Sequence, residues 1–290
     1  MADSWRCIVE EGCEVMRKKP IRVLQIIGDV VGGGVEQVIL NYYRHIDRNE
    51  VQFDFILHNG ALKSYVDNIE SLGGKVYKIT PYKSNPVKTV LEMYKIMKGN
   101  YQIVHSNMNA LSVFPLFAAY LAGVPVRILH NHSTDTKAEP LRTFVKHLLR
   151  PFARLFANEY WACSKLAGEW MYGKQAVADG KVTIINNAID LKQFAFDEAK
   201  RNKLRKELGL QDCFVIGHVG RFMKQKNHDF LVDIFAEIVK EQDDVKLLLI
   251  GDGPLREQIE NKVKTLGLDE KVIFTGVRSD VADLYNAMDV

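Results

Sequence analysis

The stretch GHVGRFMKQKN, from Gly217 to Asn227, joins a predicted strand to a predicted helix and says more about the fold than any other part of the chain. Before it, DCFVIGHVG is a short apolar, β-branched run that ends in glycine, which is typical of a core strand in a parallel sheet. After it, NHDFLVDIFAEIVKEQ repeats apolar residues at helical spacing. The turn between them carries the cations Arg221, Lys224 and Lys226. A helix that starts at such a turn offers free amides and partial positive charge, so the stretch predicts an anion site in an α/β protein.

Strand and helix patterns alternate along the rest of the chain, which predicts mostly parallel sheets. Seven strand-like runs precede residue 190: IRVLQIIGDV, VQFDFILHN, KVYKIT, YQIVHSN, VPVRILHNH, EYWACS and KVTIINNAI. Three more follow: CFVIGHVG, VKLLLIGDG and KVIFTGV. We therefore predict two Rossmann-like, doubly wound domains, at 21–190 and 191–290, after an N-terminal extension at 1–20. We also expect the second domain to be incomplete, because its series of strands stops at NAMDV.

The composition is that of a soluble globular protein of two-domain size, with 290 residues, 47% hydrophobic and 26% charged. A net charge of +3 gives no reason to expect a nucleic-acid partner. The four cysteines are scattered without a C-x-x-C pair, which favours reduced thiols in a cytoplasmic protein over disulfides or zinc. The N-terminus does not resemble a secretion signal.

The longest apolar stretch, LSVFPLFAAYLAGVPV, predicts a buried helix, because prolines interrupt it and it is too short to span a bilayer. The predicted helix at 139–156 combines leucine and phenylalanine with basic residues. One of these, Lys137, lies just before the range, and the others lie within it: Arg142, Lys146, His147, Arg150 and Arg154. Such a helix either lies on an anionic membrane surface or presents a solvated basic face over an ordinary core.

Two further segments place polar or glycine residues at the carboxyl ends of predicted strands. Gly33 and Gly34 lie between a strand and a helix, where backbone amides can approach a ligand closely; the alternative is a flexible turn. The run RILHNHSTDT ends its strand with four polar residues, His130, Asn131, His132 and Ser133. They are either ligand-binding or loop-capping residues. A zinc site is disfavoured because no third ligand has a matching spacing.

Seven motifs in this order resemble the family-four retaining glycosyltransferases of the GT-B type fold, in the branch that makes bacterial polysaccharides. The motifs are GGGVEQVILN, RILHNHS, ACSKLAGEWMYG, NNAIDLKQF, GHVGRFMKQKNHDFLVDIF, LLLIGDGPLREQIE and VIFTGVRSDVADLYNAMDV. The resemblance extends from Ile21 to Val290. It implies transfer of a sugar from a nucleotide sugar, with UDP as the expected nucleotide, to a saccharide or lipid-linked acceptor in cell-surface exopolysaccharide synthesis.

The resemblance also implies roles for particular residues. Arg221 and Lys226 would hold the donor diphosphate, and His132 would contact the transferred sugar or the acceptor, with His130 as the alternative. The donor would also meet residues of the glycine loop and of the second domain: Gly33, Gly34, Gly251, Asp252, Gly253, Gly276 and Val277. No metal or other cofactor, and no protein nucleophile, is expected. The enzyme would lie in the cytoplasm, peripheral to the inner membrane face.

The chain departs from the family pattern after MDV, where family members continue into a loop with glutamates that bind the donor. We therefore expect this chain to transfer sugar negligibly and to expose a sheet edge that can pair with another chain. Two other functions stay open. One is a sugar-nucleotide-binding remnant without turnover, and the other is a nucleotide-sugar epimerase of similar fold. The combination of HNHS with the cationic turn favours transfer over epimerisation.

Overall fold

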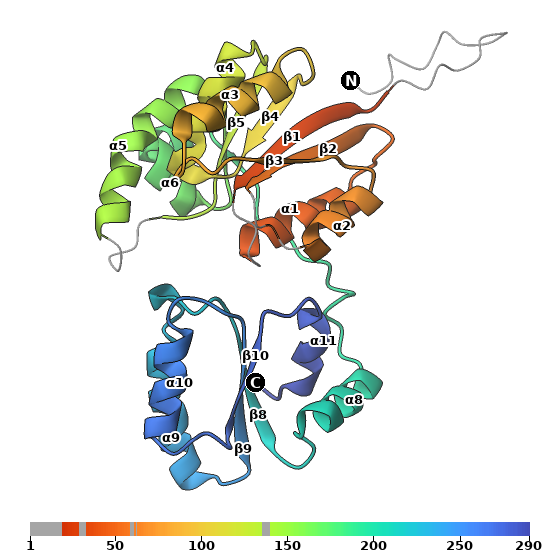
Figure 1. Ribbon diagram of the computed structural model, residues 1–290, viewed down its shortest axis with the longest axis vertical. Helices are drawn as coiled ribbons and strands as arrows, with labels where there is room; N and C mark the ends of the chain where they lie inside the picture. Colours follow the sequence, from red (N-terminus) through yellow and green to blue (C-terminus); the bar gives the residue numbers. More distant parts are fainter. Residues whose placement is uncertain (1–18, 29–32, 59–60, 62, 135–139) are drawn as a thin grey trace, which may run out of the picture.

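The computed structural model describes residues 19–28, 33–58, 61, 63–134 and 140–290, without the side chains of 140–142. The predicted N-terminal extension falls almost entirely outside these residues. The described chain forms two parallel sheets, each with its own helices (Figure 1). This confirms the predicted α/β class with two Rossmann-like sheets, while the domain boundaries at 190 and 191 stay a prediction.

The larger sheet has the strand order β3-β2-β1-β4-β5-β6-β7, with all neighbours parallel. From β1 the chain adds β2 and β3 toward one edge of the sheet and then β4 to β7 toward the other, so the strand order reverses between β1 and β4. Rossmann-like sheets bind ligands at such a point. The strands are β1 (Ile21–Gly28), β2 (Val51–His58), β3 (Val76–Ile79), β4 (Ile103–Ser106), β5 (Val126–Asn131), β6 (Glu159–Ala162) and β7 (Thr183–Ile184).

Helices cover both faces of this sheet, because alternate residues of the central strands point to opposite sides. On one face Leu24 and Ile26 pack with Met93 of α3. On the other Ile27 and Phe55 pack with residues of α1 and α2. The helices are α1 (Gly34–His45), α2 (Lys63–Ser71), α3 (Pro86–Met97), the 3-10 helix η1 (Asn109–Ser112), α4 (Val113–Leu121), α5 (Pro140–Phe156), α6 (Lys165–Tyr172) and α7 (Lys174–Ala178).

Two features of this part differ from the sequence prediction. The last strand, β7, has only two residues, because the chain then leaves the sheet for α1: the Tyr42 hydroxyl donates to the Asn186 carbonyl at 2.5 Å. The prediction that the apolar stretch around α4 is a buried helix is wrong for one face. Leu116 is fully buried, but Tyr120 and Leu121 are 56% and 52% exposed.

The smaller sheet has the order β10-β9-β8 and carries its helices on both sides. Its elements are α8 (Glu198–Leu208), β8 (Phe214–Val219), η2 (Lys224–Lys226), α9 (His228–Glu241), β9 (Val245–Ile250), α10 (Arg256–Thr265), β10 (Val272–Gly276), α11 (Val281–Leu284) and η3 (Tyr285–Ala287). The buried aliphatic strand β9 forms its centre, with Phe222 and Phe235 packed against it.

Helix α8 follows the predicted domain boundary at residue 190 and is bound tightly to the smaller sheet. The buried Arg205 donates to the carbonyls of Cys213 and Ala287 and to the carboxylate of Asp289. Asp289 also accepts from the Val215 amide, at 2.7 Å. The Gly217 amide donates to the Val290 carbonyl at 2.8 Å. The last residues therefore run along β8 and cover part of the edge that we expected to be exposed, and self-association through that edge stays a prediction.

A buried carboxylate supports the amino end of the larger sheet. Asp54 of β2 is fully buried and accepts hydrogen bonds from Arg22, from the Tyr101 hydroxyl at 2.7 Å and from the Lys75 amide at 2.7 Å. Burial by itself raises the pKa of Asp54, but these hydrogen bonds outweigh it and hold the pKa below its ordinary value. The folded state therefore contains an ionised Asp54 that joins β1, β2 and the chain before β3 and β4.

We predict that Asp54→Ala lowers the free energy of unfolding by about 3 kcal/mol, because it leaves a partly buried arginine without its partner. Since the pKa of Asp54 is lowered by folding, its contribution is present above the unfolded pKa and is lost as the pH falls through the folded pKa. Urea unfolding of both proteins between pH 3 and 7 measures this, and the variant should show the weaker acid dependence.

The matched control is Asp67→Ala, which removes an exposed ion pair with Lys63 and should change the unfolding midpoint little. Equal effects of the two substitutions would contradict the role assigned to Asp54.

Candidate functional site

Polar side chains gather at the carboxyl ends of β1, β4 and β5, next to the point where the strand order reverses. β4 is followed by Asn107, and β5 by His132 and Ser133. The Asn107 amide donates to the Ile26 carbonyl of β1 at 2.9 Å, which fixes the end of β4 against β1. His105 of β4 and His130 of β5 are neighbours across the two strands, with Nε2 and Nδ1 3.0 Å apart.

Three histidine rings stack in this cluster. The rings of His105 and His130 lie 5.2 Å apart and nearly parallel, and those of His130 and His132 lie 4.0 Å apart. Trp161 of β6 closes the group with its ring edge-on to His105 at 4.9 Å. The structure thus brings together the predicted residues His130 and His132 and adds His105 and Trp161.

Hydrogen bonds fix the tautomer of His132. The Asn107 side-chain amide donates to Gln25 Oε1 at 3.1 Å and to the His105 carbonyl at 3.4 Å, so its Oδ1 is the remaining acceptor. That Oδ1 lies 2.9 Å from His132 Nε2, which must carry the hydrogen. In a neutral imidazole the other nitrogen is then an acceptor. His132 Nδ1 has no hydrogen-bond partner among the described residues.

Burial keeps all three rings neutral. It lowers the pKa of His132 to about 4, and it lowers the pKa of His105 to about 3 and of His130 to about 2, with smaller effects of the neighbouring imidazoles on the last two. A group of neutral imidazoles offers hydrogen-bond donors and acceptors without charge. It therefore suits sugar hydroxyl groups better than phosphates.

The remaining two residues of the predicted HNHS segment have structural contacts. The fully buried Asn131 donates to the carbonyls of Ser133 and Ala167, each at 2.8 Å, and so ties the loop to α6. The Ser133 hydroxyl accepts from Asn109 at 3.2 Å. Both therefore shape the loop that holds His132, and their predicted contact with the acceptor is not tested.

His105, Asn107 and Gln25 also belong to the cluster, and the sequence did not predict them. The sequence contains a sign of the first two residues, because YQIVHSN ends an apolar strand in polar residues, as RILHNHS does. Only the strand order places these two ends next to each other and next to Gln25 of β1.

The predicted glycine loop lies at the start of α1. Gly33 is the residue before the helix, and no side chain caps the helix there. A Cβ at Gly33 would lie 2.5 Å from the Glu36 carboxylate, so this position admits no side chain without a shift of that carboxylate; a Cβ at Gly34 would meet nothing. Glu36 is buried. The predicted contact of Gly33 and Gly34 with the donor is not tested.

The second candidate surface is the carboxyl edge of the smaller sheet, where the loops after β8, β9 and β10 meet. A Cβ at Gly251 would lie 2.1 Å from the Gly220 carbonyl oxygen, and one at Gly253 would lie 2.6 Å from that of Phe222. No larger residue fits at either place. The close approach lets the Phe222 amide donate to the Asp252 carbonyl at 3.0 Å, and it fixes the loop that carries Arg221.

Arg221 and Lys226 are both exposed at this edge. The stem of Lys226 lies over Gly220, where a Cβ would be 3.3 Å from its Cγ and Cδ, and its charge contributes to the lowered pKa values of His218 and His228. Neither residue forms an ion pair with any part of the chain that the structure describes, whereas the nearby Arg256 pairs with Glu260 at 2.7 Å. This loop thus carries two exposed cations without a carboxylate partner in the described part of the chain.

Helix α9 begins immediately after these cations. Asn227 precedes it in the left-handed conformation, with φ of 50°, and its side chain does not cap the helix. The first amides of the helix are therefore available to an anion, and the helix dipole adds partial positive charge. Arg221 and Lys226 therefore lie in the loop between β8 and the start of α9, and their role at this turn stays a prediction.

The other predicted donor residues follow β9 and β10. The Gly251 amide donates to the Gly276 carbonyl at 2.9 Å, so the two loops adjoin, and Val277 is 50% exposed beside them. Asp252 has partners within its own loop: it accepts from the Gly253 amide at 2.7 Å and pairs with Arg256 at 3.6 Å. Their contact with a nucleotide is not tested.

The described residues contain no group of three His, Cys, Asp or Glu residues arranged to hold a metal ion. They also contain no helix long and apolar enough to cross a membrane. The expectation that no metal or cofactor takes part stays a prediction.

Known proteins resemble this chain along both halves. Residues 32–193 match the family described as Glycosyltransferase Family 4, and residues 213–290 match that described as Glycosyl transferases group 1. The glycosyltransferase EpsF of Bacillus subtilis is 32% identical over 95% of this chain and 73% of its own length. The UDP-Gal:alpha-D-GlcNAc-diphosphoundecaprenol alpha-1,3-galactosyltransferase of Escherichia coli is 26% identical, over 89% and 69%.

Among solved structures, Anabaena HepE in complex with UDP-glucose has a TM-score of 0.72 at 22% identity, covering 93% of this chain and 72% of that one. At this identity the likeness concerns the fold, which is the GT-B arrangement of two Rossmann-like domains. The matches along both halves and the similarity to EpsF together show that the chain belongs to glycosyltransferase family 4.

Proposed function

We propose that this glycosyltransferase moves a sugar from a UDP-sugar to a saccharide of a lipid-linked acceptor, with retention of configuration, in the synthesis of a cell-surface polysaccharide. The observation that carries the proposal is the pair of exposed cations, Arg221 and Lys226, at the uncapped start of α9. A nucleoside diphosphate is the anion that a glycosyltransferase must bind and release.

The reaction gives these groups a catalytic role. As the bond between the sugar and the diphosphate breaks, negative charge grows on the leaving phosphate oxygens. Fixed cations and helix amides stabilise that charge more in the transition state than in the ground state, which is the condition for faster reaction. The acceptor hydroxyl can attack the same face of the sugar that the diphosphate leaves, and the leaving phosphate oxygen can accept its proton. Retention of configuration then requires no protein nucleophile.

The neutral histidine cluster is the proposed contact for sugar hydroxyls. With Nε2–H directed to Asn107, His132 keeps the lone pair of Nδ1 for a hydroxyl of the acceptor or of the transferred sugar. His130 lies one layer deeper, at 3% exposed, between His105 and His132, and so acts mainly as a support.

The relatives support the choice of substrates. The name of the E. coli enzyme specifies UDP-galactose as its donor and a sugar on diphosphoundecaprenol as its acceptor. The Staphylococcus aureus relative, 28% identical over 70% of this chain, is named as a capsular polysaccharide biosynthesis glycosyltransferase. The alternative of a remnant that binds sugar nucleotides without turnover predicts UDP binding and no transfer to any acceptor.

We also propose that this part of the chain meets a membrane through an apolar patch on α4 and α5. The patch consists of exposed apolar and aromatic residues: Phe117, Tyr120, Leu121, Phe144, Leu148, Phe152 and Leu155. On α5 these residues share one side of the helix, opposite the fully buried Ala153. The ring of Phe156 joins the helices, at 5.0 Å from Phe117 and 5.8 Å from Tyr120.

The charge beside the patch suits an anionic lipid surface. Residues 140–156 contain four arginines and lysines and no carboxylate. One of these, Arg150, is bound to the protein, since it donates to the Trp170 carbonyl at 2.7 Å, whereas Arg154 is exposed. Interfacial helices that bind anionic bilayers combine an apolar face with basic residues, and α5 has both.

We predict that Arg221→Ala and Lys226→Ala each weaken UDP binding by about tenfold or more, equivalent to about 1.4 kcal/mol, because each removes a charge that faces the diphosphate. Isothermal titration calorimetry with UDP measures the effect. Lys224→Ala is the matched control, since it removes an exposed lysine from the same turn and should change affinity by less than about twofold. An equal loss in all three variants would indicate general electrostatic attraction.

We predict that, in a protein extended past Val290 as family members are, His132→Ala reduces the rate of sugar transfer more than His130→Ala does, with a loss of about tenfold or more for His132. The reason is that His132 is only partly buried, whereas His130 is 3% exposed and lies beneath it. Transfer is measured with labelled UDP-sugars and a lipid-linked acceptor extract, and circular dichroism checks that both variants fold. The reverse order would exchange the roles of the two residues.

We predict that Leu148→Asp and Leu155→Asp each reduce binding to phosphatidylglycerol vesicles by about tenfold or more, because each places a carboxylate on the apolar face. Co-sedimentation with vesicles measures the binding. The control is Leu91→Asp, which changes a 53% exposed leucine on α3, away from the patch. The assignment would fail if the control lost as much binding, or if the unaltered chain did not bind.

A further inference from the structure

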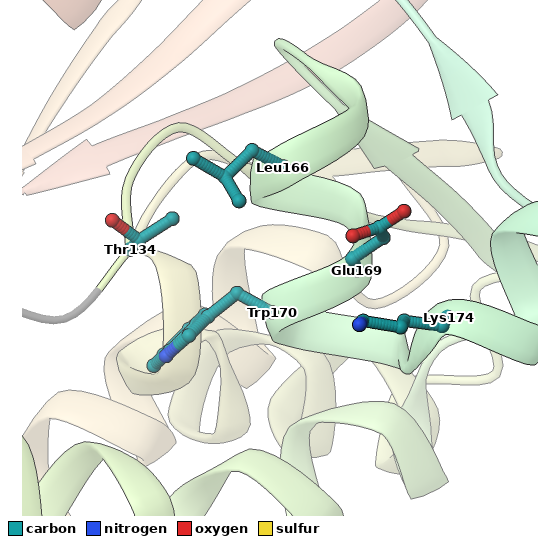
Figure 2. Close-up of a pocket in the computed structure, with 5 residues that line it drawn as sticks. All are labelled: Thr134, Leu166, Glu169, Trp170 and Lys174. Atoms are coloured by element: carbon teal, nitrogen blue, oxygen red, sulfur yellow. The ribbon is translucent and has the colours of Figure 1, made fainter.

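A cavity of about 330 Å³ lies beside the loop that holds His132, between that loop and α6. It is lined by Thr134, Leu166, Glu169, Trp170 and Lys174. Figure 2 shows Leu166 and Trp170 projecting from α6 toward Thr134, with Glu169 and Lys174 beside them. None of these residues takes part in the donor site or the histidine cluster described above.

The aromatic wall of the cavity is held in a fixed orientation. The Arg150 guanidinium lies over the Trp170 ring at 5.6 Å, and the same arginine donates to the Trp170 carbonyl. His147 packs edge-on to the indole at 5.9 Å. Leu166 is 67% exposed at the cavity. A preformed aromatic and aliphatic wall therefore faces the solvent here.

The polar wall carries one charge of each sign. Glu169 is paired only weakly, with Lys165 at 4.0 Å, and Lys174 has no ion-pair partner among the described residues. The balanced charge argues against a phosphate, which would be repelled by Glu169. An isoprenoid chain is disfavoured as well, because it would remove both charged groups from water without replacing their hydrogen bonds.

A saccharide matches both walls. The C–H face of a pyranose ring packs on an indole, and its hydroxyls can donate to a carboxylate and accept from an ammonium or a threonine hydroxyl. The volume lies at the lower end of the range for small-molecule sites and is sufficient for one or two sugar rings. Thr134 is two residues beyond His132, and Asn131 ties the base of this loop to α6, so the cavity adjoins the proposed reaction site.

We infer that this cavity binds a saccharide unit of the acceptor, with Trp170 and Leu166 as its packing surface and Glu169 and Lys174 as its hydrogen-bonding groups. The inference rests on the proposed function, since it assigns a subsite to the acceptor of that reaction. It places the acceptor saccharide against α6, next to α5, whose other side carries the apolar patch.

Saturation-transfer NMR tests the inference with three probes: the methyl β-glycosides of glucose, galactose and N-acetylglucosamine. Saturating UDP is present so that the donor site is filled. We expect at least one glycoside to receive saturation from the unaltered chain. The signal should disappear in Trp170→Ala, persist in Trp170→Phe and fall several-fold in Leu166→Ala. Leu91→Ala, which shortens another exposed leucine on a helix, should leave it unchanged.

Two results would overturn the inference. One is the absence of saturation for all three glycosides, and the other is an equal signal in the unaltered chain, Trp170→Ala and Leu166→Ala. Leu166 is exposed, so its variant is informative even where Trp170→Ala unfolds. UDP binding by the unaltered chain is recorded separately; its absence would count against the proposed donor and leave the result for the cavity unaffected.

Discussion

Parallel pairing of the strands is the constraint on which the rest of this structure depends. It brings the carboxyl end of each strand to one edge of its sheet, so that segments distant in sequence become neighbours there. In the larger sheet this joins the end of β4 to the end of β5, and in the smaller sheet it joins the loops after β8, β9 and β10. The close approach of Gly251 to Gly220 shows how tightly the second set of loops is packed.

The two edges differ in their electrostatics, and the difference corresponds to the two halves of the proposed reaction. The edge of the smaller sheet presents exposed cations and a helix N-terminus, which suit a diphosphate. The edge of the larger sheet presents histidines whose pKa values burial holds far below neutrality, together with amide side chains. Neutral donors and acceptors suit hydroxyl groups, because they form hydrogen bonds without attracting a competing ion.

Helix α5 connects the site to the surface of the molecule. One of its sides holds Trp170 through Arg150, and another presents leucines and phenylalanines to solvent beside α4. A lipid-linked saccharide has a polar head and an apolar tail, so adjacent polar and apolar surfaces on one helix fit such a molecule. Only the side of α5 that contains Ala153 packs in the buried core. Core packing therefore explains neither the contact of Arg150 with Trp170 nor the exposed apolar side of α5.

The sequence by itself determined the fold class and the position of the cationic turn between β8 and α9, because both depend on local order. Alternating strand and helix patterns require a parallel sheet, and Arg221 and Lys226 lie within one turn of the chain. Tertiary structure decided what depends on distant segments. Strand order places His105 and Asn107 beside His132. Hydropathy alone predicted a buried helix at α4, but in the structure Tyr120 contacts Phe156 of α5 and remains 56% exposed. The binding of α8 to the smaller sheet through Arg205 likewise rests on residues more than 80 positions away, which no local pattern encodes.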